Sequence, residues 1–466
     1  MLEQLEALVG AGNVVRGADM ARWSSDWTGA YAFTPLAVVR PGTTEEVSAV
    51  VKWANETGTP IVPVSGNTGL AGGTRAEGAL MLSLDRMNKI REMRPEARVA
   101  IVEAGVILSN LHAAADAEEM IFPLTFGAKG SAMIGGCLST NAGGSNVLRY
   151  GNTRDLVLGI EAVLPNGEIM NIMSELHKDN SGYNLKHLLI GAEGTLGIIT
   201  AAVLKLHPKP GAYATAMVAP PSLDAALVLL NRLQQATGGA VEAFEYMPRK
   251  HIEVHKQINP AAREPFEAPQ DINILVEVGA TAPRDCQVGD DGQTPISAYL
   301  EDTLMAMFEE GMLLDAVVAT SEAQRQEMWE RREAAAEISM THKPFLANDI
   351  AVPLDKVATF LTAMEARLSA IDPKAEAISV AHLGDGNVHY TVWLSSDDAA
   401  QRDQIMEAVE DEALALGGSF SAEHGIGVSK LPSMRRRKDP VALAAMQAVK
   451  GALDPKGIMN PGKLLP

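Results

Sequence analysis

The chain has 466 residues, more than one typical hydrophobic core holds, and we therefore expect two or three domains. Its composition is 47% hydrophobic, which is typical of a globular protein, and its net charge of −19 argues against nucleic acid and anionic membrane surfaces as partners. The two cysteines, Cys137 and Cys286, exclude a disulfide framework, a cysteine-rich zinc site and an iron–sulfur cluster held by this chain alone.

The sequence also lacks the marks of a membrane-spanning or exported protein. It contains no run of about 18 apolar residues, so no membrane span is expected. Residues 1–17 carry acidic side chains where a signal peptide would carry basic ones, and they predict an amphipathic helix. We therefore expect a cytoplasmic protein.

The first 210 residues are rich in short apolar runs that are interrupted by glycine. Residues 36–66 predict a strand, a helix and a strand, in which Thr43 and Glu46 have the spacing of a capping box and Gly58 suits the helix end. Residues 155–172 predict a hairpin, because two apolar runs are joined by Pro-Asn-Gly. A further strand is expected to end at Pro208.

After residue 210 the pattern changes to longer helices that alternate with strands. Residues 212–247 predict a strand, a helix and a strand, and the tail 453–466 is too rich in proline and glycine to be a helix. This alternation predicts an antiparallel or mixed α+β domain. Long helical runs are expected at 296–311, 321–340, 354–371 and 398–416.

Three segments carry unusual amounts of glycine: 63–73, 123–163 and 179–200. Glycine permits positive φ angles and lets backbone N–H groups approach a phosphate closely. None of the segments is a Rossmann fingerprint or a Walker motif, yet together they suit a long ligand such as a dinucleotide. The alternative is a set of tight turns that bind nothing.

The second half contains a candidate metal site. In "AHLGDGNVHY" (381–390), His382 and His389 flank turn glycines that would let both rings converge, and "AEHGIG" supplies Glu423. Two imidazoles and a carboxylate suit Zn²⁺ or another first-row divalent ion with positions open for substrate. Asp385 is a competing ligand, although it more naturally orients a histidine. The alternative is a turn that happens to carry histidines.

Six motifs in order give the chain a family resemblance. "PVSGNTGLAGG", "GGCLSTNAGG", "RYGNTRDLVLGIEAVLPNGEI" and "DNSGYNLKHLLIGAEGTLGIIT" resemble the FAD domain of the vanillyl-alcohol-oxidase type. With "AHLGDGNVHY" and "EHGIG", the chain from about residue 30 onward resembles the FAD-linked D-2-hydroxyacid dehydrogenases, which include D-2-hydroxyglutarate dehydrogenase, D-lactate dehydrogenase and the glycolate oxidase flavin subunit.

The resemblance implies an α+β fold with two domains. Residues 1–210, completed by 455–466, would form a two-subdomain FAD-binding domain of the vanillyl-alcohol-oxidase (PCMH) type. Residues 211–454 would form an α+β substrate- and metal-binding domain with an antiparallel sheet, the FAD-linked oxidase C-terminal domain.

The resemblance also implies FAD as cofactor. Some relatives attach FAD through a histidine of the first loop, but here that loop has Ser65, so we expect noncovalent FAD. The residues that correspond to FAD contacts are Pro63, Val64, Ser65, Gly66, Asn67, Thr68, Gly69, Leu70, Pro123, Leu124, Gly127, Ser131, Gly135, Gly136, Thr140, Asn141, Gly143, Gly144, Glu193, Gly194, Gly197, Ile199 and Asn460.

For the metal, the resemblance implies Zn²⁺ or Mn²⁺ held by His382, His389 and Glu423. His424 is adjacent to one of these ligands, and an imidazole can accept a proton near neutral pH, so we interpret it as the general base. The alternatives for His424 are a further metal ligand or a histidine that only stabilises its loop.

Four residues are expected to bind substrate: Arg332, Asn387, Lys343 and Thr391. Lys343 lies near the family's lysine position but is offset from it, and Thr391 stands where the family has an asparagine just after the second metal histidine. Arg332 matches an arginine that clamps the distal carboxylate in D-2-hydroxyglutarate enzymes. The family's threonine and lysine in this clamp correspond here to Ala336 and Ala347. These departures leave room for a smaller or less polar acid.

The expected reaction is the oxidation of a D-2-hydroxyacid to a 2-oxoacid, with the C2 hydride passing to flavin N5. D-2-hydroxyglutarate, D-lactate or a related acid would be the substrate, and a quinone, a cytochrome or an electron-transfer flavoprotein would accept the electrons. A homodimer is expected from the family alone. The alternatives are a flavin subunit of a glycolate-oxidase-like complex that is inactive alone, and a metal-dependent hydrolase whose glycine loops bind only phosphate.

Overall fold

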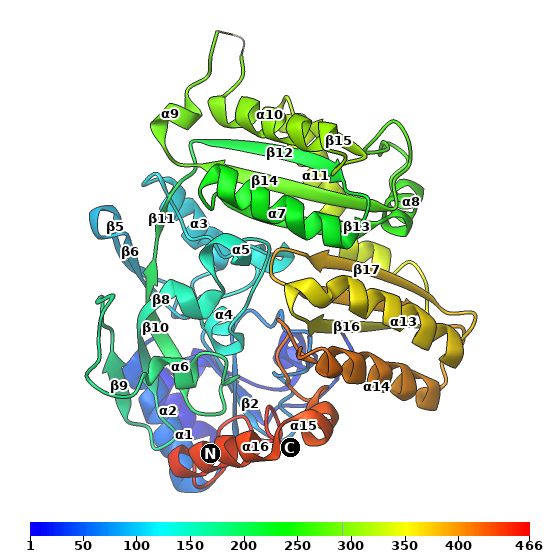
Figure 1. Cartoon of the computed structure of the whole chain (residues 1–466). Helices are drawn as coiled ribbons and strands as arrows, with labels where there is room; N and C mark the ends of the chain where they lie inside the picture. Colours follow the sequence, from blue (N-terminus) through cyan, green and yellow to red (C-terminus); the bar gives the residue numbers. More distant parts are fainter. Residues whose placement is uncertain (291) are drawn as a thin grey trace. The chain divides into compact units, whose positions relative to one another are not determined.

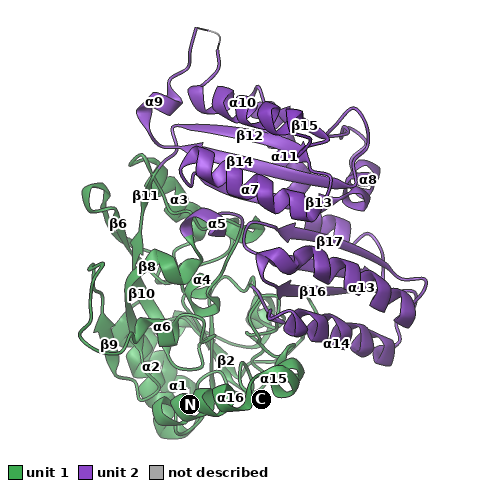
Figure 2. Ribbon diagram, viewed as in Figure 1, with its two compact units in different colours: residues 1–144, 151–208, 423–466 green, residues 145–150, 209–422 purple. Residues whose placement is uncertain are grey.

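The computed structural model describes residues 1–290 and 292–466, which form two compact units (Figure 2). The first unit consists of Met1–Gly144, Gly151–Pro208 and Glu423–Pro466. The second consists of Ser145–Tyr150 and Lys209–Ala422. Among the described helices, none is long and apolar enough to cross a membrane.

The first unit is built on two main sheets (Figure 1). Its helices and strands are α1 (Leu2–Val9), β1 (Val14–Val15), β2 (Ala37–Val39), α2 (Thr44–Thr57), β3 (Ile61–Val64), β4 (Leu80–Ser83), β5 (Ile90–Arg94), β6 (Val99–Glu103), α3 (Leu108–Asp116), β7 (Met120–Ile121), α4 (Ile134–Thr140), β8 (Val157–Val163), β9 (Ile169–Ile172), α6 (Lys186–Leu189), β10 (Ile198–Lys205), β11 (His207–Pro208), α15 (Leu431–Arg437) and α16 (Pro440–Leu453). One sheet has the order β1-β2-β4-β3, in which β2, β4 and β3 are parallel. The other is antiparallel, with the order β5-β6-β10-β8-β9.

Local sequence signals set several of these elements. The Thr43 side chain accepts a hydrogen bond from the N–H of Glu46 (3.2 Å), and Gly58 ends α2 in the left-handed region (φ 69°). The Glu46 carboxylate reaches one residue further than a capping box requires and accepts from the N–H of Gly42 (2.7 Å). The predicted helix and the predicted β8–β9 hairpin are both confirmed.

The C-terminal tail is part of the core of the first unit. As predicted, no helix follows α16, and the tail instead pairs with β3: Asn460 N–H donates to the carbonyl of Ile61, and Ile61 N–H donates to the carbonyl of Ile458 (2.8 Å each). Ile458 and Met459 are buried together with α1 and α2. This pairing places Asn460 beside Ile61, the first residue of β3, two residues before the first glycine-rich segment begins.

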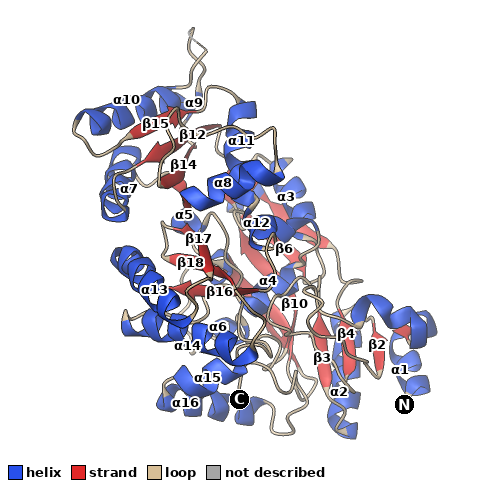
Figure 3. Ribbon diagram, turned by 90° about the vertical axis from the view of Figure 1, so that its right-hand side faces the viewer, coloured by secondary structure: helices blue, strands red, loops and turns tan. Residues whose placement is uncertain are grey.

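The second unit is one seven-stranded sheet with helices on both faces (Figure 3). Its helices and strands are α5 (Val147–Tyr150), β12 (Ala212–Ala219), α7 (Leu223–Thr237), β13 (Val241–Pro248), α8 (Arg249–Ile258), β14 (Ile272–Ala280), α9 (Pro283–Cys286), α10 (Pro295–Glu309), β15 (Asp315–Val318), α11 (Glu322–Glu333), α12 (Ala335–Ser339), β16 (Phe345–Ala351), α13 (Val357–Ile371), β17 (Glu376–His382), β18 (Asn387–Trp393) and α14 (Ala399–Ala415). The strand order is β15-β12-β14-β13-β17-β18-β16, and every neighbouring pair is antiparallel.

The alternation of side chains along the strands separates the two faces of this sheet. Residues such as Phe244, Val388 and Ile350 pack against α7, α10, α13 and α14 in the main core. The opposite face contributes Ala243, Met247 and other residues to a smaller core with α8 and α11. By the same alternation, residues 245, 349, 382 and 389 lie on the face that carries α8, α11 and α12.

The helix expected over 321–340 is instead two helices. The break is at Ala334, whose ψ angle of −4° departs from helical geometry. Trp329 of α11 donates to Glu277 of β14, whereas Ile338 of α12 is buried beside Trp393 of β18. The two halves therefore pack on different strands of the sheet.

Candidate functional site

The glycine-rich segments assigned to FAD come together within the first unit. A Cβ atom on Gly66 would lie 2.2 Å from the carbonyl oxygen of Ser131, and one on Gly194 would lie 2.4 Å from Cγ of Pro63. Gly135 packs in the same way against Ala104, where a Cβ would lie 2.8 Å from the Ala104 methyl group. Only glycine permits these close approaches, so the glycines let the three segments pack closely on their neighbours.

Asn460 joins the C-terminal tail to these segments. Its Nδ2 donates to the carbonyls of Glu193 (2.7 Å) and Gly73 (3.2 Å). Its Oδ1 is buried and has no hydrogen-bond partner among the described residues. A buried acceptor of this kind suits a ligand that brings a donor, as the flavin ring would.

The "EHGIG" segment packs on the same loops. The Glu193 carboxylate accepts from the N–H groups of Ile426 (2.7 Å) and Gly427 (2.8 Å). Burial raises the pKa of Glu193, and these two amides offset part of that effect. A Cβ on Gly143 would lie 2.6 Å from Oε1 of Glu423, so this carboxylate lies against the second glycine-rich segment.

In the second unit, the hairpin of β17 and β18 brings the two predicted histidines together. The rings of His382 and His389 have centroids 5.4 Å apart and cross at 79°. Gly386 has φ 83°, and a Cβ there would lie 2.2 Å from the carbonyl of Val352. The two histidine rings thus lie next to each other at this turn.

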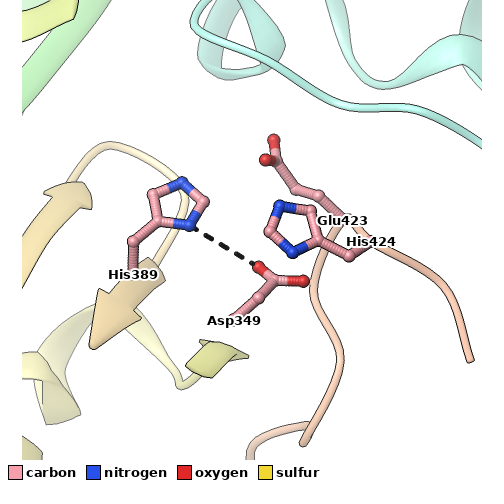
Figure 4. A group of neighbouring side chains, drawn as sticks. All are labelled: Asp349, His389, Glu423 and His424. Atoms are coloured by element: carbon pink, nitrogen blue, oxygen red, sulfur yellow. Dashed lines mark ion pairs between the residues drawn. The ribbon is translucent and has the colours of Figure 1, made fainter. Parts of the chain in front are cut away.

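Four side chains form a group that could hold a metal ion: Asp349, His389, Glu423 and His424 (Figure 4). One ligand atom from each lies within 4.8 Å of the others. Asp349 of β16 is paired in register with His389 of β18, and Asp349 Oδ1 lies 3.9 Å from Nδ1 of His389. Glu423 and His424 directly follow Ala422, whose N–H donates to the carbonyl of Asp349 (3.3 Å).

The group overlaps with the predicted ligand set but is not identical to it. His389 and Glu423 belong to both, His424 joins as a fourth candidate, and His382 lies beside the group through its ring contact with His389. Sequence reasoning missed Asp349. The available signal was a lone carboxylate within the apolar strand "ANDIAV", which is 3% exposed in the structure.

His382 is held by a second residue that the sequence analysis missed. Its Nδ1 lies 2.9 Å from Oε1 and 2.8 Å from Oε2 of Glu245, and Nε of Arg332 donates to the same carboxylate (2.8 Å). Burial alone would raise the pKa of Glu245, but the charges and hydrogen bonds of His382 and Arg332 outweigh it and lower that pKa.

The predicted substrate residues differ in their surroundings. Arg332 is buried, and its Nη2 has no hydrogen-bond partner among the described residues. Asn387 donates to Asp349 Oδ1 (3.0 Å), next to the candidate metal group. Thr391 is buried and lies 3.2 Å from the Ser339 hydroxyl. Lys343 is exposed, at a shallow depression lined by Pro344, Phe345, Asp397 and Arg402.

Asp385 does not belong to the group of four. Its carboxylate accepts from the backbone N–H of Asn387 (3.1 Å), and burial raises its pKa.

Comparison with known proteins agrees with this arrangement. The family model "FAD linked oxidases, C-terminal domain" matches residues 209–464, and the model "FAD binding domain" matches residues 35–173. The chain is 35% identical to a D-2-hydroxyglutarate dehydrogenase of Xanthomonas citri pv. viticola, over 96% of this chain and 93% of the relative. It is 34% identical to a D-2-hydroxyglutarate dehydrogenase of Stutzerimonas stutzeri, over 100% of this chain and 98% of the relative.

Solved structures share the fold at lower identity. p-Cresol methylhydroxylase with substrate bound superposes with a TM-score of 0.73 at 18% identity, over 99% of this chain and 95% of that one. 4-Ethylphenol oxidase from Gulosibacter chungangensis gives a TM-score of 0.71 at 19% identity, over 100% and 97% of the two chains. These likenesses confirm the predicted vanillyl-alcohol-oxidase type of fold. The chain belongs to the FAD-linked D-2-hydroxyacid dehydrogenase family and is an FAD-dependent dehydrogenase.

Proposed function

We propose that the protein oxidises a D-2-hydroxyacid to the 2-oxoacid with noncovalent FAD and a divalent metal ion. The proposal is based on the position of Glu423. Its carboxylate belongs to the group of four potential metal ligands, and it lies against Gly143 of a segment assigned to FAD. A carboxylate that lies next to potential metal ligands and next to a segment assigned to FAD suits a reaction in which one small substrate contacts a metal ion and a flavin.

The residues of the first unit fit FAD. At several glycines of these segments a side chain would collide with neighbouring protein atoms, so bare backbone forms these loops. Bare backbone can approach a pyrophosphate closely. Asn460 Oδ1 is a buried acceptor without a protein partner among the described residues. Ser65 stands where a covalent histidine link would be. When bound, FAD would supply the hydride acceptor.

The candidate group fits a divalent ion by its donor set. Imidazole nitrogen and carboxylate oxygen are ligands that both Zn²⁺ and Mn²⁺ accept. We propose His382, His389 and Glu423 as the protein ligands. An ion there would lower the pKa of the substrate 2-hydroxyl and hold its carboxylate. Asp349 would orient these residues without binding the ion itself, since its Oδ1 accepts a hydrogen bond from Asn387 and lies near Nδ1 of His389.

We assign the proton transfer to His424. Its imidazole would accept the 2-hydroxyl proton, and bound FAD would supply the acceptor for the C2 hydrogen, which would leave with its electron pair as a hydride. The C–O single bond of the substrate would thereby become the carbonyl of the 2-oxoacid, a two-electron oxidation for which FAD would be the acceptor. Glu193 holds the amides of Ile426 and Gly427, and it would thereby fix the turn that carries His424.

Arg332 provides a site for a second anionic group. With Nε bound to Glu245, its Nη2 remains to bind a carboxylate, and Asn387 would orient the substrate beside the metal ion. A substrate with two carboxylates would use both positions, which favours D-2-hydroxyglutarate. D-lactate and related acids would use only the first position. Lys343 and Thr391 remain further proposed contacts.

Electrons would leave the reduced flavin for a quinone, a cytochrome or an electron-transfer flavoprotein. The proposed donor chemistry can be tested without the acceptor, because flavin reduction is itself visible. We therefore propose anaerobic titration of the FAD-loaded protein with the D and L enantiomers of 2-hydroxyglutarate, lactate and malate.

Bleaching of the flavin absorbance by one or more D-acids, with the matching L-acids inactive, is the expected result. D-2-hydroxyglutarate should act at the lowest concentration. A flavin that none of these acids reduces would contradict the proposal, and a protein that binds no FAD would contradict the assignment of the glycine segments as well.

A further inference from the structure

We propose that Glu245 is a positioning residue that serves the metal site and the substrate site at once. It would fix His382 for metal binding and Arg332 for substrate binding. The inference rests on the proposed function, because it takes His382 as a metal ligand and Arg332 as a substrate-carboxylate ligand.

The geometry around Glu245 is set by the sheet. Glu245 of β13 is paired in register with His382 of β17, so the two side chains stand next to each other on the same face. The Glu245 side chain is 1% exposed, and its two oxygens take up His382 Nδ1 and Arg332 Nε at 2.8–2.9 Å. A carboxylate this deeply buried is stable only with partners of opposite charge or strong hydrogen bonds.

The contact fixes the tautomer of His382. An ionised carboxylate can only accept hydrogen bonds, so Nδ1 of His382 must carry the hydrogen. The lone pair of the neutral ring is then on Nε2, and this is the nitrogen through which His382 would bind a metal ion. A carboxylate behind a metal-binding histidine also increases the basicity of the ring, and the loss of such a partner typically weakens metal affinity about 10- to 100-fold.

The same carboxylate fixes the plane of Arg332. The guanidinium is rigid and planar, so holding Nε determines where the terminal nitrogens point. Nη2 has no partner among the described residues, although the side chain is only 9% exposed. Glu245 would thus position the residues that bind both ends of the substrate: His382 at the metal ion and Arg332 at the other end.

Glu242 of the same strand offers a matched control. It is also a buried carboxylate (3% exposed) and is also paired with an arginine, since Arg149 Nη1 donates to it at 2.7 Å. A second donor to it is the hydroxyl of Tyr150 (2.7 Å), and neither partner belongs to the candidate site. Glu242→Gln therefore reproduces the loss of a buried charge without touching a proposed ligand.

The experiment measures the affinity of the FAD-loaded protein for Zn²⁺ by competition with a chromophoric chelator. The variants are Glu245→Gln, Glu242→Gln, His382→Ala, His389→Ala and the double variant Glu245→Gln/His382→Ala. The amide introduced by Glu245→Gln would place either an uncharged acceptor or a donor against Nδ1, so we expect this variant to weaken Zn²⁺ binding by about 10- to 100-fold. Glu242→Gln should stay within about threefold of the wild type.

The double variant tests whether Glu245 acts through His382. If it does, the combined change weakens Zn²⁺ binding no further than His382→Ala alone, because the two residues act as one unit. Additive losses would overturn the proposal. In steady-state kinetics, Glu245→Gln should also raise KM for D-2-hydroxyglutarate more than KM for D-lactate, because only the diacid would use Arg332.

The outcomes separate this inference from the proposed function. A wild-type protein that does not bind Zn²⁺, or one whose Zn²⁺ affinity is unchanged in His389→Ala, overturns both. A wild type that binds Zn²⁺ and loses it in His389→Ala, but keeps it within about threefold in Glu245→Gln, overturns the role of Glu245 alone.

Glu245→Asp covers the case in which Glu245→Gln does not fold. It retains the buried negative charge for Arg332 but withdraws the carboxylate by one methylene group from Nδ1. We expect FAD content and circular dichroism like those of the wild type, with a loss of Zn²⁺ affinity of about fivefold or more by the same mechanism. Unchanged affinity in a folded Glu245→Asp protein would overturn the proposal.

Discussion

His424 is one of the four side chains that could bind a metal ion, yet we assign it to proton transfer. The reason is its setting: it follows Glu423 directly and precedes a turn whose amides are held by Glu193. A base must stay free of the metal ion to accept a proton at neutral pH, whereas a ligand must give up its lone pair. The two roles make different predictions for the same substitution.

His424→Asn should lower the rate of flavin reduction by a D-2-hydroxyacid by about 10²- to 10⁴-fold, the range for loss of a general base. Its Zn²⁺ content should equal that of the wild type, as measured by atomic absorption on the purified protein. His389→Asn is the matched comparison, and it should lose both activity and Zn²⁺. A His424→Asn protein without Zn²⁺ would make His424 a ligand instead.

Arg332 is the proposed ligand of the second carboxylate of the substrate. Arg332→Gln removes the proposed carboxylate contact of Nη2, and charged hydrogen bonds are worth about 1.5–3 kcal/mol, or roughly 10- to 100-fold in binding. We expect kcat/KM for D-2-hydroxyglutarate to fall by that factor while kcat/KM for D-lactate changes much less.

Arg331→Gln serves as control, because Arg331 Nη2 donates to the carbonyl of Arg263 and not to Glu245. This control should leave the ratio of the two kcat/KM values as in the wild type. Equal losses for both acids in Arg332→Gln would show that Arg332 has no role in choosing the diacid.

Among the elements, α8 and α11 are joined by a buried histidine. His251 of α8 is 1% exposed, and its Nε2 lies 2.7 Å from the carbonyl of Arg331, to which it donates. Burial is the main reason that the pKa of His251 is lowered to about 3. This residue is therefore neutral in the folded protein at neutral pH.

The lowered pKa makes the stability of the second unit sensitive to mild acid. In the unfolded chain this histidine binds a proton at its ordinary pKa of about 6.5, whereas in the folded protein it does not until about pH 3. Stability is thus undiminished above about pH 6.5 and falls as the pH drops from 6.5 toward 3, by about 1.4 kcal/mol per pH unit for this one group. His251→Gln, which can still donate to Arg331, should remove that share.

Urea unfolding of the wild type and of His251→Gln at about pH 7.5, 6.5 and 5.5 would measure the difference between them. The gap in unfolding free energy should shift in favour of the variant as the pH falls. A gap that stays constant across this range would show that His251 is not a buried neutral group.

The elements also show what the sequence could and could not predict. The cap at Thr43, the β8–β9 turn and the convergence of His382 with His389 all depend on residues close together in the chain, so local rules predict them. Glu245 reaches His382 only because β13 pairs with β17, although the two residues are 137 positions apart. Such pairing is fixed by the packing of the whole sheet, which local patterns do not encode.

The role of Asp349 also depends on strand pairing that local sequence patterns do not predict. It is the only carboxylate in an otherwise mostly apolar strand, and its register with His389 of β18 places it in the candidate metal group. The break at Ala334 is similar, because Ala-rich sequence favours a continuous helix. There the contacts of α11 and α12 with different strands decide the outcome.

For the whole molecule, the net charge of −19 must be reconciled with an anionic substrate and an anionic cofactor. The glycine segments would meet phosphates with backbone N–H groups, which need no basic side chains. Arg332 is paired with only one carboxylate and keeps Nη2 without a partner among the described residues. The backbone N–H groups at the proposed FAD site and Arg332 at the proposed substrate site would thus offset the repulsion between an acidic protein and its anionic ligands.

The proposed reaction requires that a single divalent ion and FAD act on the same substrate molecule. The most direct test is stopped-flow flavin reduction by D-2-hydroxyglutarate in chelator-treated, FAD-loaded protein, as Zn²⁺ or Mn²⁺ is added back in steps. We predict almost no reduction without metal and a rate that rises with added ion, reaching its maximum at one equivalent per chain. Flavin reduction that is equally fast in the metal-free protein would show that the divalent ion has no part in the reaction.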